Sequence, residues 1–212
     1  MSGPEFGARF RAELRDLLAW RRDVRCFRRD PLAPDTFERL LRTACLAPSV
    51  GLSEPWRFVL VESRAARAAV RSSFETCNAA ALREQPGDRA ALYARLKLAG
   101  LDAAPCQFAL FADRHVSQGG GLGRATMPET VDYSAVMAVH TLWLVARAEG
   151  IGLGWVSILD PAAVRIALDV PFGWHFVGYF CLGYPSETDD IPTLERDGWE
   201  SRSDLGSVLF VR

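Results

Sequence analysis

Residues 131–149 constrain the fold more than any other segment, because they predict a long helix that is apolar on more than one face. Its apolar residues include Val136, Val139, Leu142, Trp143 and Val145. Gly150 follows directly and suits the left-handed residue that commonly ends a helix. A helix that is apolar all round lies within a core or against another subunit. The chain therefore wraps other elements around this helix, or pairs it with a second copy.

Hydrophobic periodicity and turn residues predict the remaining elements. Helices are expected over about 10–20, after an N-cap at Asp35 and up to Pro48, over 64–83, from Pro86-Gly87 to about Gly100, and from Pro161. Strands are expected at 56–61, 107–112, 152–158 and 176–182. The terminal run 208–211 could add a strand to a partner's sheet. The 212 residues contain no repeat and no dividing linker, which predicts one domain, 1–212. Whether residues 1–15 are ordered or disordered stays open.

Composition excludes several classes of protein. A net charge of −1 gives no reason to expect nucleic acid or a membrane surface as the main partner. The apolar run 135–146 is too short to span a bilayer, and the charged first residues do not form a secretory signal. Five cysteines without a Cys-x-x-Cys pair favour reduced thiols, and the three histidines lack metal-ligand spacing. A cytoplasmic protein without a metal site is therefore expected.

Five consecutive residues, Arg21-Arg22-Asp23-Val24-Arg25, place a carboxylate within a cluster of three guanidiniums. Arginine presents several N–H donors in one plane and suits phosphate and other anionic acceptors. The carboxylate either neutralises the cluster or does chemistry beside it. Taken alone, the cluster is also consistent with a solvated charged turn at the end of a helix.

Two later segments have features of a ligand site. Residues 47–56 read Ala-Pro-Ser-Val-Gly-Leu-Ser-Glu-Pro-Trp, a turn whose serine and backbone amides suit the polar edge of a ring. Residues 152–157 read Gly-Leu-Gly-Trp-Val-Ser, and their glycines allow close backbone approach to a flat ligand. Each segment alone is a weak signal, since glycines in a strand usually mark a bulge or tight packing. With the arginine cluster, they predict convergence on one aromatic ligand that carries an anion.

Residues 113–128 hold a glycine-rich stretch, with glycine at 119, 120, 121 and 123. Consecutive glycines do not hold one backbone shape cheaply, which predicts a mobile loop. A loop of this length in a compact domain is usually functional. We expect a lid over the ligand, with a merely mobile connection as the alternative.

The order of these segments resembles the nitroreductase family of flavin enzymes. Residues 21–27 match its pattern Arg-Arg-Ser-(Val/Ile)-Arg-x-(Phe/Tyr) at every position except Asp23, and residues 47–58 resemble its Ala-Pro-Ser…Gln/Glu-Pro-Trp-x-Phe segment. Residues 152–156 are similar to its glycine-rich strand beneath the flavin, and Arg202 to the basic residue that meets the FMN phosphate. The resemblance implies an α+β fold, a mixed central β-sheet wrapped by helices, and an intertwined homodimer with FMN at the interface.

Two departures from the family pattern point to one of its branches. Asp23 stands where serine is usual, and Leu52 stands where many relatives carry asparagine. A carboxylate beside flavin disfavours the anionic reduced ring and could move protons. This combination resembles the flavin-fragmenting branch, the 5,6-dimethylbenzimidazole synthases. That resemblance implies that reduced FMN is consumed with O2 as co-substrate, giving 5,6-dimethylbenzimidazole, the lower ligand of cobalamin, and D-erythrose 4-phosphate.

The same resemblance implies roles for individual residues. Asp23 is the expected general acid or base, and Ser157 is expected to position the reacting face unless it only bonds a neighbouring carbonyl. The phosphate, the ribityl oxygens or the ring edge would be held by Arg21, Arg22, Arg25 and Arg202. Which arginine contacts which part of FMN stays open. The full expected flavin-binding set is Arg21, Arg22, Asp23, Val24, Arg25, Pro48, Ser49, Leu98, Gly154, Trp155, Ser157 and Arg202.

Two other functions remain open from the sequence. An NAD(P)H-dependent FMN nitroreductase or quinone reductase would keep its flavin through many turnovers. A flavin-binding regulatory or storage module would show no turnover, and Asp23 would then form only a salt bridge. If the loop at 113–128 shields the flavin from nicotinamide, a separate NAD(P)H flavin reductase is expected to supply reduced FMN.

Overall fold

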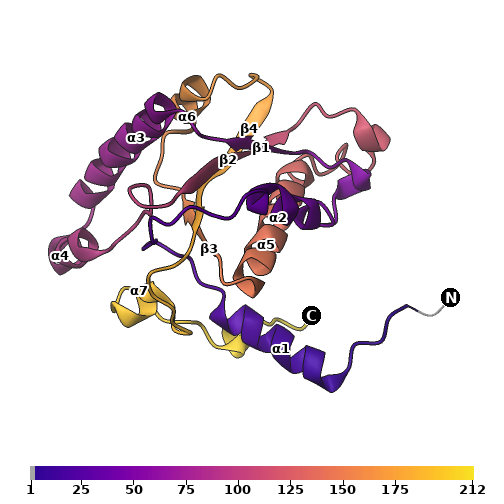
Figure 1. Ribbon diagram of the computed structural model, residues 1–212, viewed down its shortest axis with the longest axis horizontal. Coiled ribbons are helices and arrows are strands. Elements are labelled where there is room, and N and C mark those ends of the chain that lie inside the picture. The colour runs from indigo at the N-terminus through magenta and orange to yellow at the C-terminus, as the bar shows by residue number, and fades with distance from the viewer. Residues whose placement is uncertain (1–2) are drawn as a thin grey trace.

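The computed structural model describes residues 3–212, and its centre is a four-stranded sheet. The strands are β1 (Trp56–Leu60), β2 (Cys106–Asp113), β3 (Gly152–Val156) and β4 (Trp174–Gly183), in the order β1-β2-β4-β3. All three strand pairs are antiparallel, with a register shift between Leu110 and Phe111 of β2. The sheet is therefore continuous from β1 to β3, and β3 is one of its two edge strands (Figure 1).

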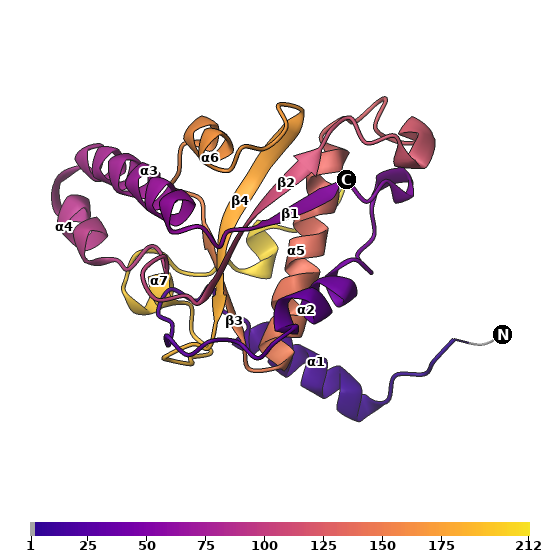
Figure 2. The same cartoon turned by 45° about the horizontal axis from the view of Figure 1, so that its top comes forward.

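The β2 strand is buried on both faces, which explains its apolar run at residues 108–112. Phe108, Leu110 and Ala112 belong to one buried cluster, and Ala109 and Phe111 to a second cluster on the opposite face. Side chains alternate across a strand, so each face of the sheet needs its own covering layer. Helices α2 (Thr36–Ala44) and α5 (Thr130–Ala148) cover one face, and α3 (Arg64–Arg83) and α6 (Pro161–Ala167) cover the other (Figures 1 and 2).

The apolar segment at 131–149 is α5, as predicted. Eight of its residues are buried, among them Ala138, Val139 and Leu142. Gly150 follows with φ +72°, which confirms the left-handed residue at the helix end. Tyr133 and Met137 remain 56% and 46% exposed, so one stripe of this apolar helix is uncovered in the single chain. That stripe is a candidate contact with a second copy.

Helices α1 (Ala8–Trp20) and α4 (Gly87–Arg95) are of the predicted type and differ from the prediction at their ends. The short helix α7 (Thr193–Arg196) and the 3-10 turns η1 (Val50–Leu52), η2 (Gln118–Gly121) and η3 (Leu205–Ser207) were not predicted. The second helix ends at Ala44, four residues before Pro48. Asp35 is at its N-cap, but with φ +59° its side chain accepts no capping hydrogen bond. Helix α4 ends at Arg95 rather than near Gly100, because Leu96 is already extended.

The α+β class expected from the sequence, with a central β-sheet wrapped by helices, is confirmed. The parallel component of the sheet is small: it consists of a single bridge between Asp23 and Leu153 on the outer side of β3. This bridge places the arginine cluster at the edge of the sheet.

Candidate functional site

The segment 21–25 follows α1 directly and lies along β3. The backbone N–H of Val24 donates to the Leu153 carbonyl at 3.0 Å. The indole Nε1–H of Trp143, on α5, donates to the Arg22 carbonyl at 3.0 Å, and the guanidinium of Arg21 lies 5.0 Å from the Trp143 ring. The edge strand and the central helix together fix the arginine cluster.

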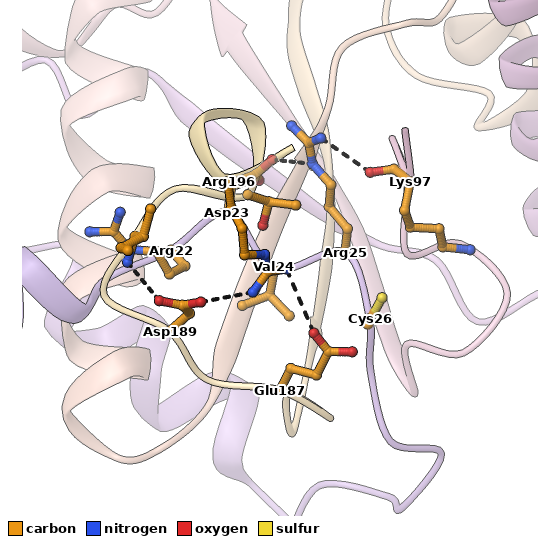
Figure 3. A pocket seen from close by; sticks show the side chains of 11 residues that line it. Arg22, Asp23, Val24, Arg25, Cys26, Lys97, Glu187, Asp189 and Arg196 are labelled. Carbon is orange, nitrogen blue, oxygen red and sulfur yellow. Dashed lines mark hydrogen bonds and ion pairs between the residues drawn. The ribbon is translucent and has the colours of Figure 1, made fainter. Parts of the chain in front are cut away.

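Asp23 is held at both carboxylate oxygens. Its Oδ1 accepts the backbone N–H of Trp155 at 2.8 Å, and its Oδ2 accepts Nε of Arg25 at 3.0 Å. A second nitrogen of Arg25 donates to the Lys97 carbonyl at 3.1 Å (Figure 3). The side chain of Asp23 is 31% exposed and that of Arg25 is 16% exposed. The carboxylate is thus oriented by two donors and still reachable from outside.

The glycines of β3 make room for this segment. A Cβ at Gly154 would lie 2.0 Å from the Val24 carbonyl oxygen, and one at Gly152 would lie 2.7 Å from a Val24 methyl. Only hydrogen at these positions allows the two backbones to approach so closely. Tight packing against Val24 therefore accounts for both glycines, and their contact with a flat ligand stays a prediction.

The charges of three guanidiniums, those of Arg21, Arg22 and Arg202, interact at this site. Burial lowers the pKa of Arg21, and the nearby charge of Arg202 lowers it further, although Asp23 acts in the opposite direction. Burial and the charges of Arg21 and Arg202 also lower the pKa of Arg22. Nε of Arg22 is buried and has no hydrogen-bond partner among residues 3–212. This cluster suits an anionic ligand with several acceptor oxygens.

All four arginines of the predicted flavin-binding set lie around one hollow together with Asp23. The hollow is lined by Arg21, Arg22, Asp23, Arg25, Pro192, Thr193, Leu194 and Arg202. Its far wall comes from α7, whose residues the sequence analysis missed. The only signal for that stretch was its acidic and proline-containing composition.

A neighbouring hollow shares residues with the first and has a mixed charge. It is lined by Arg22, Asp23, Val24, Arg25, Cys26, Lys97, Glu187, Asp189, Ile191, Thr193 and Arg196 (Figure 3). Arg196 donates to Asp189 at 2.8 Å and lies 3.8 Å from Glu187, so these ion pairs join α7 to the loop that precedes it. None of these loop residues was singled out from the sequence.

Ser157 and Leu98 each follow, within two positions along the chain, a residue that contacts the arginine cluster. Neither of them lines either hollow. Ser157 is exposed and follows the last residue of β3, two positions beyond Trp155, whose N–H binds Asp23. That is roughly 7 Å along an extended chain. Leu98 is half-buried and follows Lys97, whose carbonyl accepts from Arg25. Both are adjacent to the site, and their contact with a ligand remains a prediction.

Pro48 and Ser49 are not brought to the arginine cluster within one chain. Ser49 Oγ accepts the N–H of Glu54 at 3.1 Å, and the N–H of Val50 donates to Ser134 Oγ at 3.0 Å. Ser134 and Trp143 are nine residues apart on α5, roughly 13 Å along its axis. The two predicted ligand segments therefore contact α5 near its opposite ends.

The glycine-rich loop packs against residues 47–56. Gln118 Nε2 donates to the Leu52 carbonyl at 2.7 Å, and a Cβ at Gly119 would lie 2.4 Å from the Gly51 carbonyl oxygen. Within one chain the loop therefore packs against the segment that contains Ser49, and not against the arginine cluster. A lid role for residues 113–128 stays a prediction.

Residues 3–212 contain no cluster of three His, Cys, Asp or Glu side chains that could hold a metal ion. In this part of the chain, no helix is long and apolar enough to cross a membrane.

Comparison with known proteins identifies similar chains. A model of the nitroreductase family matches residues 18–184. The chain is 58% identical over 201 residues to a 5,6-dimethylbenzimidazole synthase of Rhodospirillum rubrum, covering 95% of each chain. It is 50% identical to a synthase of the same name from Rhodobacter capsulatus, covering 90% of this chain and 92% of the relative. A crystal structure of oxidised iodotyrosine deiodinase bound to FMN and 3-iodo-L-tyrosine has the same fold, with a TM-score of 0.72 at 21% identity over 94% of this chain and 97% of that chain.

Proposed function

This chain belongs to the nitroreductase family, and we propose that it makes 5,6-dimethylbenzimidazole, the lower ligand of cobalamin, by oxygen-dependent fragmentation of reduced FMN. D-Erythrose 4-phosphate is the second product. The observation that carries the proposal is the 58% identity with a synthase of this name over nearly all of both chains. The position of Asp23 within the arginine cluster supports it, because a flavin reductase that only passes hydride has little use for this carboxylate.

The arginine cluster fits the phosphate of FMN. The charge of Arg202 lowers the pKa of both Arg21 and Arg22, and the buried Nε–H of Arg22 has no hydrogen-bond partner among residues 3–212. A phosphate has two negative charges near neutral pH and several acceptor oxygens, so it relieves the repulsion and takes up the free donor. Reduced FMN brings the electrons for the reaction with O2 when it is bound.

Asp23 acts as the acid or base that moves protons while the ring and the ribityl chain are cleaved. Each carboxylate oxygen can accept two hydrogen bonds. Trp155 and Arg25 take one position on each oxygen, so each has a second position for a proton of the substrate. Ser157, at the end of the same strand, positions the reacting face of the flavin. Val24 and Leu98 complete the binding residues contributed by this chain.

The active unit is an intertwined homodimer with FMN at the interface. Pro48 and Ser49 lie at the other end of α5 from the arginine cluster, so a second copy supplies them to the same flavin. Exposed apolar residues on α1, α5 and the last eight residues support extensive contact: Phe10, Leu14, Leu18, Tyr133, Met137, Leu205, Val208, Leu209, Phe210 and Val211. Apolar surface on this scale usually marks an interface.

Reduced FMN comes from a separate NAD(P)H-dependent flavin reductase in the cytoplasm. All five cysteines are free thiols, which supports a reducing compartment. The loop 113–128 of the dimer limits access of nicotinamide to the flavin and closes over it.

Two assays of the purified protein test the function. The first adds stoichiometric reduced FMN without oxygen, admits air and separates the small molecules by chromatography. We expect 5,6-dimethylbenzimidazole to appear as FMN is lost. The second supplies FMN, NADH or NADPH and a nitroaromatic acceptor. Sustained oxidation of the nicotinamide with FMN recovered intact would instead identify a nitroreductase.

A further inference from the structure

We propose that Trp199 is a positioning residue for FMN binding, because it anchors the segment that carries Arg202 to α4. The inference rests on the proposed function only in taking Arg202 as a ligand of the FMN phosphate. Trp199 lines neither of the two hollows beside Asp23. It therefore acts on the ligand through Arg202, three residues along the chain.

The indole of Trp199 lies between two side chains of α4. The guanidinium of Arg89 lies over its ring, 4.1 Å from the centroid. The ring of Tyr93 meets it edge-on, with the centroids 5.9 Å apart. Cation–π and edge-to-face contacts of this kind each stabilise a pair beyond simple burial.

The anchor extends into the body of the molecule. Tyr93 is 8% exposed, and its hydroxyl donates to Asn78 Oδ1 at 2.8 Å, which ties α4 to the long helix α3. On the other side, the N–H of Trp199 donates to the Leu194 carbonyl at 2.8 Å, and Gly198 turns the chain with φ +75°. The tryptophan thus joins the α7 turn to a helix that is itself fixed.

Arg202 needs such an anchor because its own side chain has none. It is exposed, and within residues 3–212 its guanidinium makes no hydrogen bond or ion pair. Its charge is close enough to lower the pKa of Arg21 and Arg22. Like charges repel, so a free segment would swing Arg202 away from the cluster. Holding it there in advance lowers the ordering cost of binding the anion.

A double-mutant cycle with FMN and riboflavin as probes tests this role. Dissociation constants are measured for Trp199→Ala, Arg202→Ala and the double variant. We expect Trp199→Ala to weaken FMN binding roughly tenfold, with riboflavin, which lacks the phosphate, changed less than about twofold. In the Arg202→Ala background, Trp199→Ala should cause almost no further loss of FMN affinity. Trp199→Phe, which keeps an aromatic ring over Arg89, should restore most of the affinity.

Trp174→Ala is the matched control. Trp174 is also half-buried, and the guanidinium of Arg57 lies 6.0 Å from its ring, but it lies on β4 away from Arg202. This variant should bind FMN as the wild type does. Amide hydrogen exchange without ligand gives a second readout, and exchange over residues 200–204 should rise in Trp199→Ala.

Any one of three results overturns the proposal. The first is that Trp199→Ala weakens FMN binding by the same factor with and without Arg202, and the second is that it weakens FMN and riboflavin binding equally. The third is that amide hydrogen exchange over residues 200–204 is unchanged in Trp199→Ala. A wild-type protein that binds no FMN overturns both this proposal and the function. A wild-type protein that binds FMN but forms no benzimidazole overturns only the function, and the cycle still decides the role of Trp199.

Discussion

The Asp23 carboxylate accepts the backbone N–H of Trp155 at 2.8 Å, so the residue that departs from the family pattern is fixed to the glycine-rich strand. A serine at this position would be shorter by one heavy atom and uncharged. The aspartate therefore changes the charge of the arginine cluster and reaches β3 at the same time. Because of this hydrogen bond, Asp23 is the first residue to substitute in a test of the site.

Asp23→Asn should retain FMN and lose the product. The amide oxygen can still accept the N–H of Trp155, so the local shape persists, while the proton-transfer group is gone. We expect formation of 5,6-dimethylbenzimidazole to fall by roughly 100-fold or more, with FMN affinity changed much less. Product is measured by chromatography and affinity by titration. A native rate of product formation in this variant would show that Asp23 moves no proton in the reaction.

Arg21→Ala should weaken FMN binding by roughly 10- to 100-fold, since charged hydrogen bonds to phosphate are strong. Riboflavin binding should change little if Arg21 contacts the phosphate. Arg9→Ala is the control, because Arg9 is an exposed arginine on α1 that pairs with Glu13. Equal loss of FMN and riboflavin affinity would place Arg21 at the ring or the ribityl chain instead.

Gly154→Ala should destabilise the fold by about 3 kcal/mol or more. The added methyl would meet the Val24 carbonyl, which cannot move without breaking its bridge to β3. Gly3→Ala adds a methyl to open space ahead of α1 and should change the free energy of unfolding by less than about 0.5 kcal/mol. Urea denaturation compares the two. Similar stabilities would mean that the segment 21–25 does not pack against β3.

Stability should fall as the pH rises above 9. Burial raises the pKa of Cys106 to about 11 and that of Cys181 to about 12. A thiol whose pKa is higher folded than unfolded stabilises the fold fully below its unfolded pKa of 9.0, and that stability is lost as pH rises toward the folded value. Cys106→Ala should reduce this alkaline loss in the free energy of unfolding by on the order of 2 kcal/mol.

Urea midpoints at pH 8 and pH 11, with reductant present, measure this loss. The exposed Cys26 provides the control, and Cys26→Ala should keep the wild-type pH dependence. Identical alkaline losses in Cys106→Ala and the wild type would contradict the assignment to this thiol.

The exposed C-terminal residues should hold the dimer together. Phe210 is 70% exposed in the single chain, so Phe210→Asp would place a charge in the proposed interface. We expect the dimer to weaken at least tenfold, as measured by light scattering after size exclusion, and FMN binding to fall with it. Ile166→Asp changes another exposed apolar residue, on α6, and should leave the mass unchanged. A monomeric wild type that binds FMN would refute the interface.

The helices and strands were readable from the sequence because periodicity reports burial directly, as in α5 and β2. Helix ends were less accurate where local geometry decides: Asp35 has a positive φ and does not cap, and Leu96 leaves the helix early. The residues of the arginine cluster were found because they are consecutive. Lys97, Thr193 and Arg196 were missed because only the folded chain brings them there. Ser49 illustrates a different limit, since one folded chain does not bring it to the arginine cluster and only the proposed dimer would do so.

Isotope transfer tests the central claim most directly, because the claim is that FMN is consumed. Reduced FMN labelled with carbon-13 at the ribityl carbon attached to the ring is mixed with the protein, air is admitted, and the benzimidazole is examined by mass spectrometry. The account predicts one labelled carbon in each 5,6-dimethylbenzimidazole molecule and one FMN lost per product. Recovery of all the labelled FMN, oxidised and intact, would contradict it.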